Sequence, residues 1–150
     1  MPDLSIHERA FIKALQDEGV QFLLVGSWAL ALHGVLVNPQ DLDVLIGTDL
    51  GNAQAFARAW DCVDPKPGSR IAPVTLGPYQ QDTIILGPGR GDALTAIGGV
   101  DFEEAWQRRE MRTVGDLQVP VLARVDLIAT LQSSERPRDR QRLALLQERP

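Results

Sequence analysis

The chain has 150 residues, of which 44% are hydrophobic and 23% are charged, and its formal net charge is −5. This length and composition are typical of one globular domain, and no apolar run approaches a membrane span, so we expect no membrane association. The acidic balance disfavours extended binding to nucleic-acid backbones, which needs clustered Lys and Arg.

The first part of the chain predicts a helix, a strand and a second helix. Residues 1–19 hold one amphipathic helix, with apolar side chains at helical spacing over 4–18 and a glycine to end it. Its first residues include acids where a signal segment would be basic and apolar, so we expect a cytoplasmic protein. The run VQFLLVG (20–26) predicts a central strand. SWALALHG (27–34) predicts a helix with Ser27 as its N-cap.

A second strand and helix follow. QDLDVLIG (40–47) predicts a buried strand that begins at Asp41, and NAQAFARAW (52–60) predicts an amphipathic helix. Cys62 is the only cysteine, which excludes an intramolecular disulfide and a metal site built from cysteines. We expect it to be a small buried residue near the helix end. Proline and glycine then predict an irregular segment over 61–78.

The next elements are predicted to be two strands and a helix. YQQDTIIL (79–86) and DALTAI (92–97) predict the strands, with a turn at GPGRG (87–91) between them. DFEEAWQRRE (101–110) predicts a helix that begins with a capping box formed by Asp101 and the glutamate three residues later.

The chain is predicted to close with a hairpin and two helices. MRTVGDLQVPVLA (111–123) predicts a hairpin that turns at Gly115-Asp116. Two helices over 125–147 follow, near 125–133 and 137–147, the second opened by a proline in its first turn. Together these elements predict a single domain over residues 1–150, of the α/β (α+β) class, with helices on one or both faces of a sheet.

Two aspartates open the strand in QDLDVLIG. Residues two apart on a strand share a face, so Asp41 and Asp43 should project their carboxylates from one side, about 7 Å apart at Cα. At an effective dielectric constant near 20 these charges repel by about 2–3 kcal/mol. A divalent cation removes that repulsion, and carboxylate oxygens suit Mg²⁺ or Mn²⁺. The pair therefore indicates either a metal clamp or a strand end whose acids face water.

A glycine and a serine lie where the first strand meets the next helix. Backbone N–H groups at the start of a helix are positively polarised, and a glycine lets an anion approach the backbone closely. Gly26 and Ser27 are therefore candidates for binding a phosphate group. The alternative is an ordinary strand-to-helix turn with a serine N-cap.

The combination of these two motifs resembles the DNA polymerase β-like nucleotidyltransferases. In LLVGSWALALHGVLVNPQDLDVLI, thirteen residues separate the Gly-Ser pair from Asp-Leu-Asp. Later segments, GDALTAIGGVDFEEAW, VPVLARVDLI and ERPRDRQRL, are similar in the same order to the minimal nucleotidyltransferases and the nucleotidyltransferase toxins of abortive-infection toxin–antitoxin systems. The resemblance covers about residues 20–145.

The resemblance implies a metal-dependent transfer of a nucleotidyl group from an NTP to a hydroxyl acceptor. Mg²⁺ or Mn²⁺ would bind Asp41, Asp43 and a third acid, which matches Asp92. Asp82, at a polar strand start, is expected to face solvent, and Asp101 is explained as an N-cap. For Asp92 the alternative is an aspartate of the preceding turn.

Four residues are candidates for phosphate binding, and the acceptor is left open. Gly26 and Ser27 match the family's motif, and Arg136 or Arg138 could replace a lysine that the family commonly has. The alternative for the two arginines is a solvated helix face. The acceptor is a protein hydroxyl, an RNA end or a small molecule. Because the chain has no room for the extra helical domain of larger relatives, we expect a second copy or a cognate partner protein to complete the site.

Three departures from the family favour an alternative function. The Arg-x-Thr before the first acid is replaced by Val37, Asn38 and Pro39, and a lysine is replaced by Leu131. The last aspartate of an Asp-x-x-Asp is replaced by Arg142. The alternative is a catalytically degenerate module that binds a nucleotide or a partner protein in a system of the toxin–antitoxin type.

Overall fold

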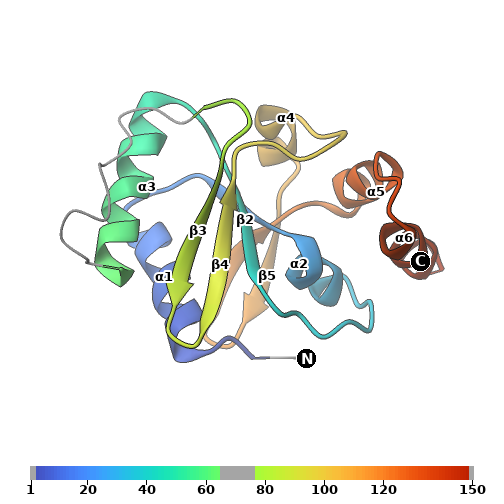
Figure 1. The fold of residues 1–150 in the computed structure, drawn as a ribbon, viewed down its shortest axis with the longest axis horizontal. Helices are drawn as coiled ribbons and strands as arrows, with labels where there is room; N and C mark the ends of the chain where they lie inside the picture. The colour runs from blue at the N-terminus through green and yellow to red at the C-terminus, as the bar shows by residue number, and fades with distance from the viewer. Residues whose placement is uncertain (1–2, 65–76, 149–150) are drawn as a thin grey trace.

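Within residues 3–64 and 77–148, which the computed structural model describes, six strands form one sheet and six helices accompany it (Figure 1). The helices are α1 (Ile6–Asp17), α2 (Gly26–Leu32), α3 (Leu50–Val63), α4 (Phe102–Gln107), α5 (Arg124–Gln132) and α6 (Pro137–Gln147). The strands are β1 (Phe22–Val25), β2 (Leu42–Ile46), β3 (Gln81–Leu86), β4 (Gly89–Leu94), β5 (Glu110–Val114) and β6 (Leu117–Val121).

The sheet is mixed, with the strand order β3-β4-β2-β1-β6-β5. Strand β1 pairs antiparallel with β2 and parallel with β6, and β2 pairs parallel with β4. The two outer pairs, β3 with β4 and β5 with β6, are antiparallel hairpins. This arrangement confirms the predicted α/β (α+β) class with a mixed sheet.

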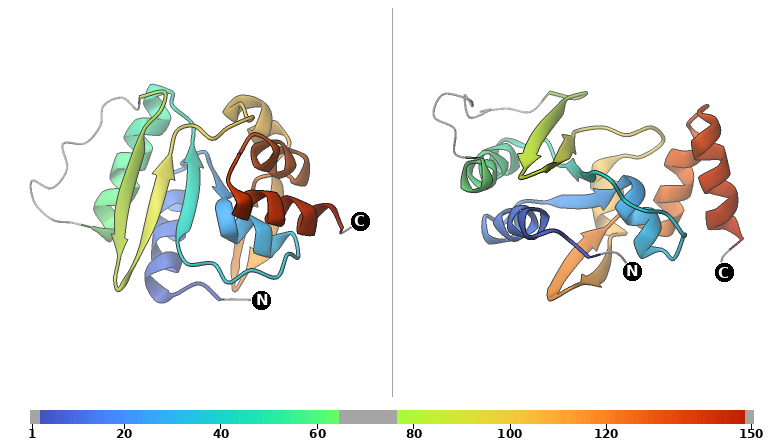
Figure 2. Two further views of the ribbon diagram at one scale, coloured as in Figure 1. Left: turned by 45° about the vertical axis from the view of Figure 1, so that its right-hand side comes forward. Right: turned by 60° about the horizontal axis from the view of Figure 1, so that its bottom comes forward.

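Helices lie on both sides of this sheet. Helices α1 and α3 pack against each other at one side, and α2 with the α5–α6 pair lies at the other (Figures 1 and 2). All four residues of β1 are buried, so the central strand supplies side chains to the core that the helices cover. Burying each such Leu or Phe contributes about 1.5–3 kcal/mol. The core thus fixes the strand ends on which the candidate acids lie.

Several predicted boundaries are confirmed. The hairpin turns at Gly115-Asp116, and the final helices lie within one residue of the predicted ranges. Asp101 caps α4, because its carboxylate accepts a hydrogen bond from the Glu104 N–H at 3.1 Å. Helix α1 begins with a capping box between Ser5 and Glu8, which was not predicted.

Two predictions about local conformation are wrong. Helix α2 begins at Gly26, so Ser27 lies in its first turn, and no side chain caps the helix. Strand β4 covers Gly89–Leu94, so most of the predicted turn 87–91 belongs to the strand. The turn needs only residues 87 and 88, because Leu86 pairs directly with Gly89 and Gly87 has a φ of +67°. Gly91 lies inside the strand, where a Cβ would lie 2.9 Å from the Leu42 carbonyl oxygen. The glycine at position 91 allows β2 and β4 to approach each other closely, so its role is in strand packing and not in the turn.

The prediction of a buried Cys62 is also wrong, because this cysteine is exposed. The buried residues of α3 run from Asn52 to Ala59, and Cys62 lies beyond the last of them, near the helix end. The helix continues through Val63 into the segment that was predicted to be irregular, of which residues 65–76 lie outside the described part of the chain. Among the helices of residues 3–64 and 77–148, none has the length and apolar composition needed to cross a bilayer.

Candidate functional site

An open cleft of about 600 Å³ lies between the sheet and the helices α2, α5 and α6. This volume lies in the range of small-molecule sites, about 300–1,000 Å³. The cleft is lined by all seven residues that the sequence singles out, namely Gly26, Ser27, Asp41, Asp43, Asp92, Arg136 and Arg138. The other two candidate acids, Asp82 and Asp101, are not among its lining residues.

Two of the acids lie side by side on neighbouring strands. In the parallel pairing of β2 with β4, Asp43 is directly opposite Asp92. Adjacent strands are about 4.8 Å apart, and paired residues project to the same face of a sheet. Asp41 lies two residues before Asp43 and lines the same cleft. The fold therefore joins acids that are far apart in the sequence.

Each of these carboxylates has a different environment. Asp92 is 8% exposed and accepts a hydrogen bond from the Thr83 hydroxyl at 2.9 Å. The Asp41 carboxylate pairs with Arg90, with both guanidinium contacts at 3.4 Å. Burial, followed by repulsion from Asp92 and from Asp41, raises the pKa of Asp43 from 3.8 to about 6, against the opposing effect of Arg90. The acids are thus crowded enough to favour a bound proton or a cation.

The donor chemistry fits a hard divalent cation, although the oxygens do not converge on one point. No group of three or more His, Cys, Asp and Glu side chains in the described residues is arranged to hold a metal ion. Asp41 faces Arg90, and Asp92 is engaged by Thr83. Asp43 and Asp92 are the adjacent pair whose repulsion a cation would relieve. The three acids share one cleft, and their role as metal ligands stays a prediction.

The turn between β1 and α2 lies directly against Asp43. Gly26 has a φ of +66°, and a Cβ at this position would lie 2.6 Å from the Asp43 Oδ2 atom. Only glycine combines this left-handed conformation with so close an approach. Ser27 is half-buried and lines the cleft beside it. The start of α2 therefore lies in contact with one of the acids, Asp43.

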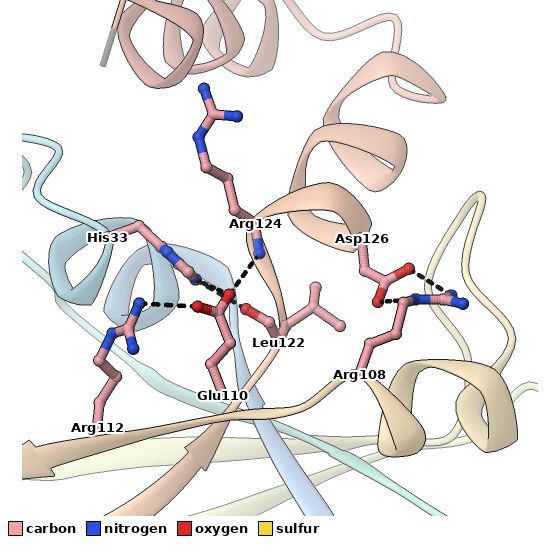
Figure 3. Close-up of polar contacts among 7 residues, drawn as sticks. All are labelled: His33, Arg108, Glu110, Arg112, Leu122, Arg124 and Asp126. Atoms are coloured by element: carbon pink, nitrogen blue, oxygen red, sulfur yellow. Dashed lines mark hydrogen bonds and ion pairs between the residues drawn. The ribbon is translucent and has the colours of Figure 1, made fainter. Parts of the chain in front are cut away.

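Helix α5 forms the opposite wall and is anchored at its first turn (Figure 3). Arg108 of the α4 C-terminus donates to both oxygens of Asp126, at 2.8 and 3.0 Å, and Asp126 is 5% exposed. The Arg124 N–H donates to Glu110 of β5 at 3.0 Å. These contacts fix α5, and therefore Leu131 on its cleft side, relative to the sheet.

Three residues near the site were not among the predicted site residues. Thr83 engages Asp92 and Arg90 pairs with Asp41, and both contacts depend on strand pairing that local patterns do not specify. Arg142 lines the cleft, and its spacing of four residues from Arg138 could have indicated this.

Comparison with known proteins supports the fold. No family model matches the chain, and no curated protein matches it. The chain is similar to a crystal structure from Thermotoga maritima described as a proposed nucleotidyltransferase, with a TM-score of 0.52 and 17% identity, covering 77% of this chain and 74% of that chain. At this identity the similarity concerns the fold alone, and it confirms the predicted nucleotidyltransferase fold.

Proposed function

We propose that the protein is a metal-dependent nucleotidyltransferase that moves a nucleotidyl group from an NTP to a hydroxyl acceptor. The observation that carries the proposal is the register of Asp43 with Asp92, beside the Gly26 turn, in a cleft of this fold. The fold by itself does not specify an activity. We also propose that this reaction takes place in the cytoplasm.

The proposal gives the chain's own residues distinct roles. Asp43 and Asp92 would hold Mg²⁺ or Mn²⁺, with Asp41 joining them when it exchanges Arg90 for the cation. When bound, the ion supplies charge neutralisation at the triphosphate and a lower pKa for the acceptor hydroxyl. Gly26 and Ser27 would orient the phosphate chain, since catalysis of this kind depends mainly on positioning and electrostatics.

A transfer assay with radiolabelled NTPs and Mg²⁺ or Mn²⁺ tests this function. Protein, RNA and small hydroxyl acceptors are offered in turn, with a second copy or a co-purified partner chain present. Asp43→Asn and Asp92→Asn should lose at least about a hundredfold in activity, as expected when charge stabilisation is removed. Asp82→Asn is the matched control, because Asp82 lies on neighbouring β3 and does not line the cleft.

The alternative is a degenerate module that binds a nucleotide or a partner protein in a toxin–antitoxin-type system. Leu131 favours it, because this residue is 6% exposed and places an apolar side chain on the cleft wall where the family resemblance implies a lysine. If the wild-type protein binds NTP with Mg²⁺ but transfers nothing to any acceptor, the alternative gains. If Asp43→Asn and Asp92→Asn bind NTP with metal as well as the wild type does, the assignment of these two acids as metal ligands is wrong.

A further inference from the structure

Two arginines of α6 face the cleft without an ionic partner. Arg138 and Arg142 are one helical turn apart, and both line the cleft. In the described part of the chain, neither guanidinium forms an ion pair or a hydrogen bond with a protein group. Arg138 is exposed and Arg142 is half-buried, so Arg142 is the member of the pair that is partly removed from water without a carboxylate partner.

The arrangement is unfavourable for the free protein. Burial lowers the pKa of Arg142, and repulsion from Arg138 lowers it further, while Asp139 offsets only part of this. The Asp139 carboxylate is itself engaged, because it accepts a hydrogen bond from the Ser134 hydroxyl at 2.6 Å. Two like charges at helical spacing destabilise a helix. An anionic ligand would remove that cost.

The helix that carries the pair is held in place. The Arg124 side chain donates to the Leu146 carbonyl oxygen at 3.1 Å, and Leu146 is fully buried. Helix α6 is therefore packed on α5, and Arg142 is presented from a fixed helix, at a half-buried position. A half-buried guanidinium gives stronger hydrogen bonds to an anion than a fully solvated one.

We propose that Arg142 joins Arg138, which the sequence already makes a candidate for phosphate binding, in a metal-independent subsite for the phosphate groups of a nucleotide ligand. The acids on the sheet side of the cleft can accept a phosphate only when a divalent cation intervenes. The α6 side carries cations of its own, whose planar forks match phosphate oxygens. The identity of the ligand as a nucleotide rests on the proposed function, whereas the affinity for polyphosphate does not.

The position of Leu131 agrees with this assignment. Leu131 and Arg142 line the same cleft from facing helices, α5 and α6. The chain has an apolar residue where the family resemblance implies a lysine, and a cation where it implies an aspartate. Of the two helices that line this side of the cleft, α6 therefore supplies the positive charge in this protein, whereas α5 has an uncharged residue at position 131.

Calorimetric titration with inorganic tripolyphosphate in EDTA tests the subsite. Arg142→Ala and Arg138→Ala should each bind at least about tenfold more weakly than the wild type, as the loss of a charge-assisted hydrogen bond predicts. Arg140→Ala is the matched control, because it removes the same charge from an exposed position of α6 that does not line the cleft. Arg142→Lys keeps the charge and should retain part of the affinity.

Further arms identify the source of the phosphate and separate the two proposals. ATP in EDTA should lose affinity in Arg142→Ala by the same factor as tripolyphosphate, whereas adenosine should show no difference. Asp43→Asn should keep metal-free tripolyphosphate binding, even if it abolishes transfer. The subsite is refuted if the wild type binds no tripolyphosphate in EDTA, or if Arg140→Ala weakens binding as much as Arg142→Ala does. If the wild type transfers no nucleotidyl group but binds tripolyphosphate in a manner that depends on Arg142, only the proposed function is overturned.

Discussion

Replacing Asp43 by Asn should stabilise the metal-free protein at neutral pH, although it removes a proposed metal ligand. Burial, Asp92 and Asp41 raise the pKa of Asp43 from 3.8 to about 6, against the opposing effect of Arg90. The folded state therefore binds this proton more tightly than the unfolded chain does. The resulting stability is complete below pH 3.8 and is lost as the pH rises through about 6.

The expected size follows from the same shift. A rise from 3.8 to about 6 corresponds to about 3 kcal/mol at pH 8. Because Asp43 is only partly buried, solvent screening reduces this to about 1–2 kcal/mol. Asp43→Asn removes the ionised group and should recover that amount. The melting temperature should rise by about 2–4 °C per kcal/mol in a chain of this length.

Urea denaturation in EDTA at pH 4 and at pH 8 measures the effect. Asp43→Asn should exceed the wild type in free energy of unfolding at pH 8 and differ little from it at pH 4. Asp82→Asn should show no such pH-dependent gain, since Asp82 lies outside the cleft. Added Mn²⁺ should stabilise the wild type more than Asp43→Asn. If Asp43→Asn is less stable than the wild type at pH 8 in EDTA, the acids do not repel each other as argued.

Two further predictions concern the same corner of the cleft. Arg90→Ala should bind Mn²⁺ several-fold more tightly, because it frees the Asp41 carboxylate from an ion pair and makes the local potential more negative. Electron paramagnetic resonance titration of free Mn²⁺ measures this, and weaker binding would contradict it. Gly26→Ala should destabilise the protein by about 2–4 kcal/mol, because a Cβ meets Asp43 Oδ2 at 2.6 Å in addition to the cost of a positive φ. Gly115→Ala is the control, because Gly115 has a φ of +60° and no atom lies within 4 Å of the added Cβ. It should lose about 1 kcal/mol of stability, from the positive φ alone. Equal losses of stability in the two variants by thermal denaturation would refute the contact argument.

The elements of the fold could be predicted from local patterns, because capping, apolar periodicity and turn residues act over a few positions. The limits appear where a glycine has a long-range role. Gly91 has the local signature of a turn, yet it lies inside β4, where it pairs with Ile84 of β3 and Leu42 of β2. Helix α2 likewise begins at Gly26, two residues earlier than a Ser27 cap would indicate. The starts of β4 and α2 thus depend on contacts between segments that are distant in the sequence, and local sequence patterns do not contain such contacts.

The residues of the candidate site also differ in how far the sequence alone could identify them. Asp41 and Asp43 could be identified from their spacing, since two residues on one strand share a face. That Asp92 lies next to Asp43 depends on the parallel pairing of β2 with β4, so only the family resemblance indicated it. Thr83 could not be identified at all, because its contact with Asp92 follows from a second pairing, of β3 with β4.

The cleft contains two unfavourable clusters of opposite sign, and this constrains what can bind there. On the sheet side, carboxylates repel one another around Asp43, and on α6 the guanidinium groups of Arg138 and Arg142 do the same. Core packing does not require either cluster, because all of these residues line an open cleft. A metal ion alone relieves the first cluster, and a polyphosphate alone relieves the second. A nucleotide triphosphate bound to a divalent cation carries both charges in one ligand, so the proposed ligand would remove both costs at once.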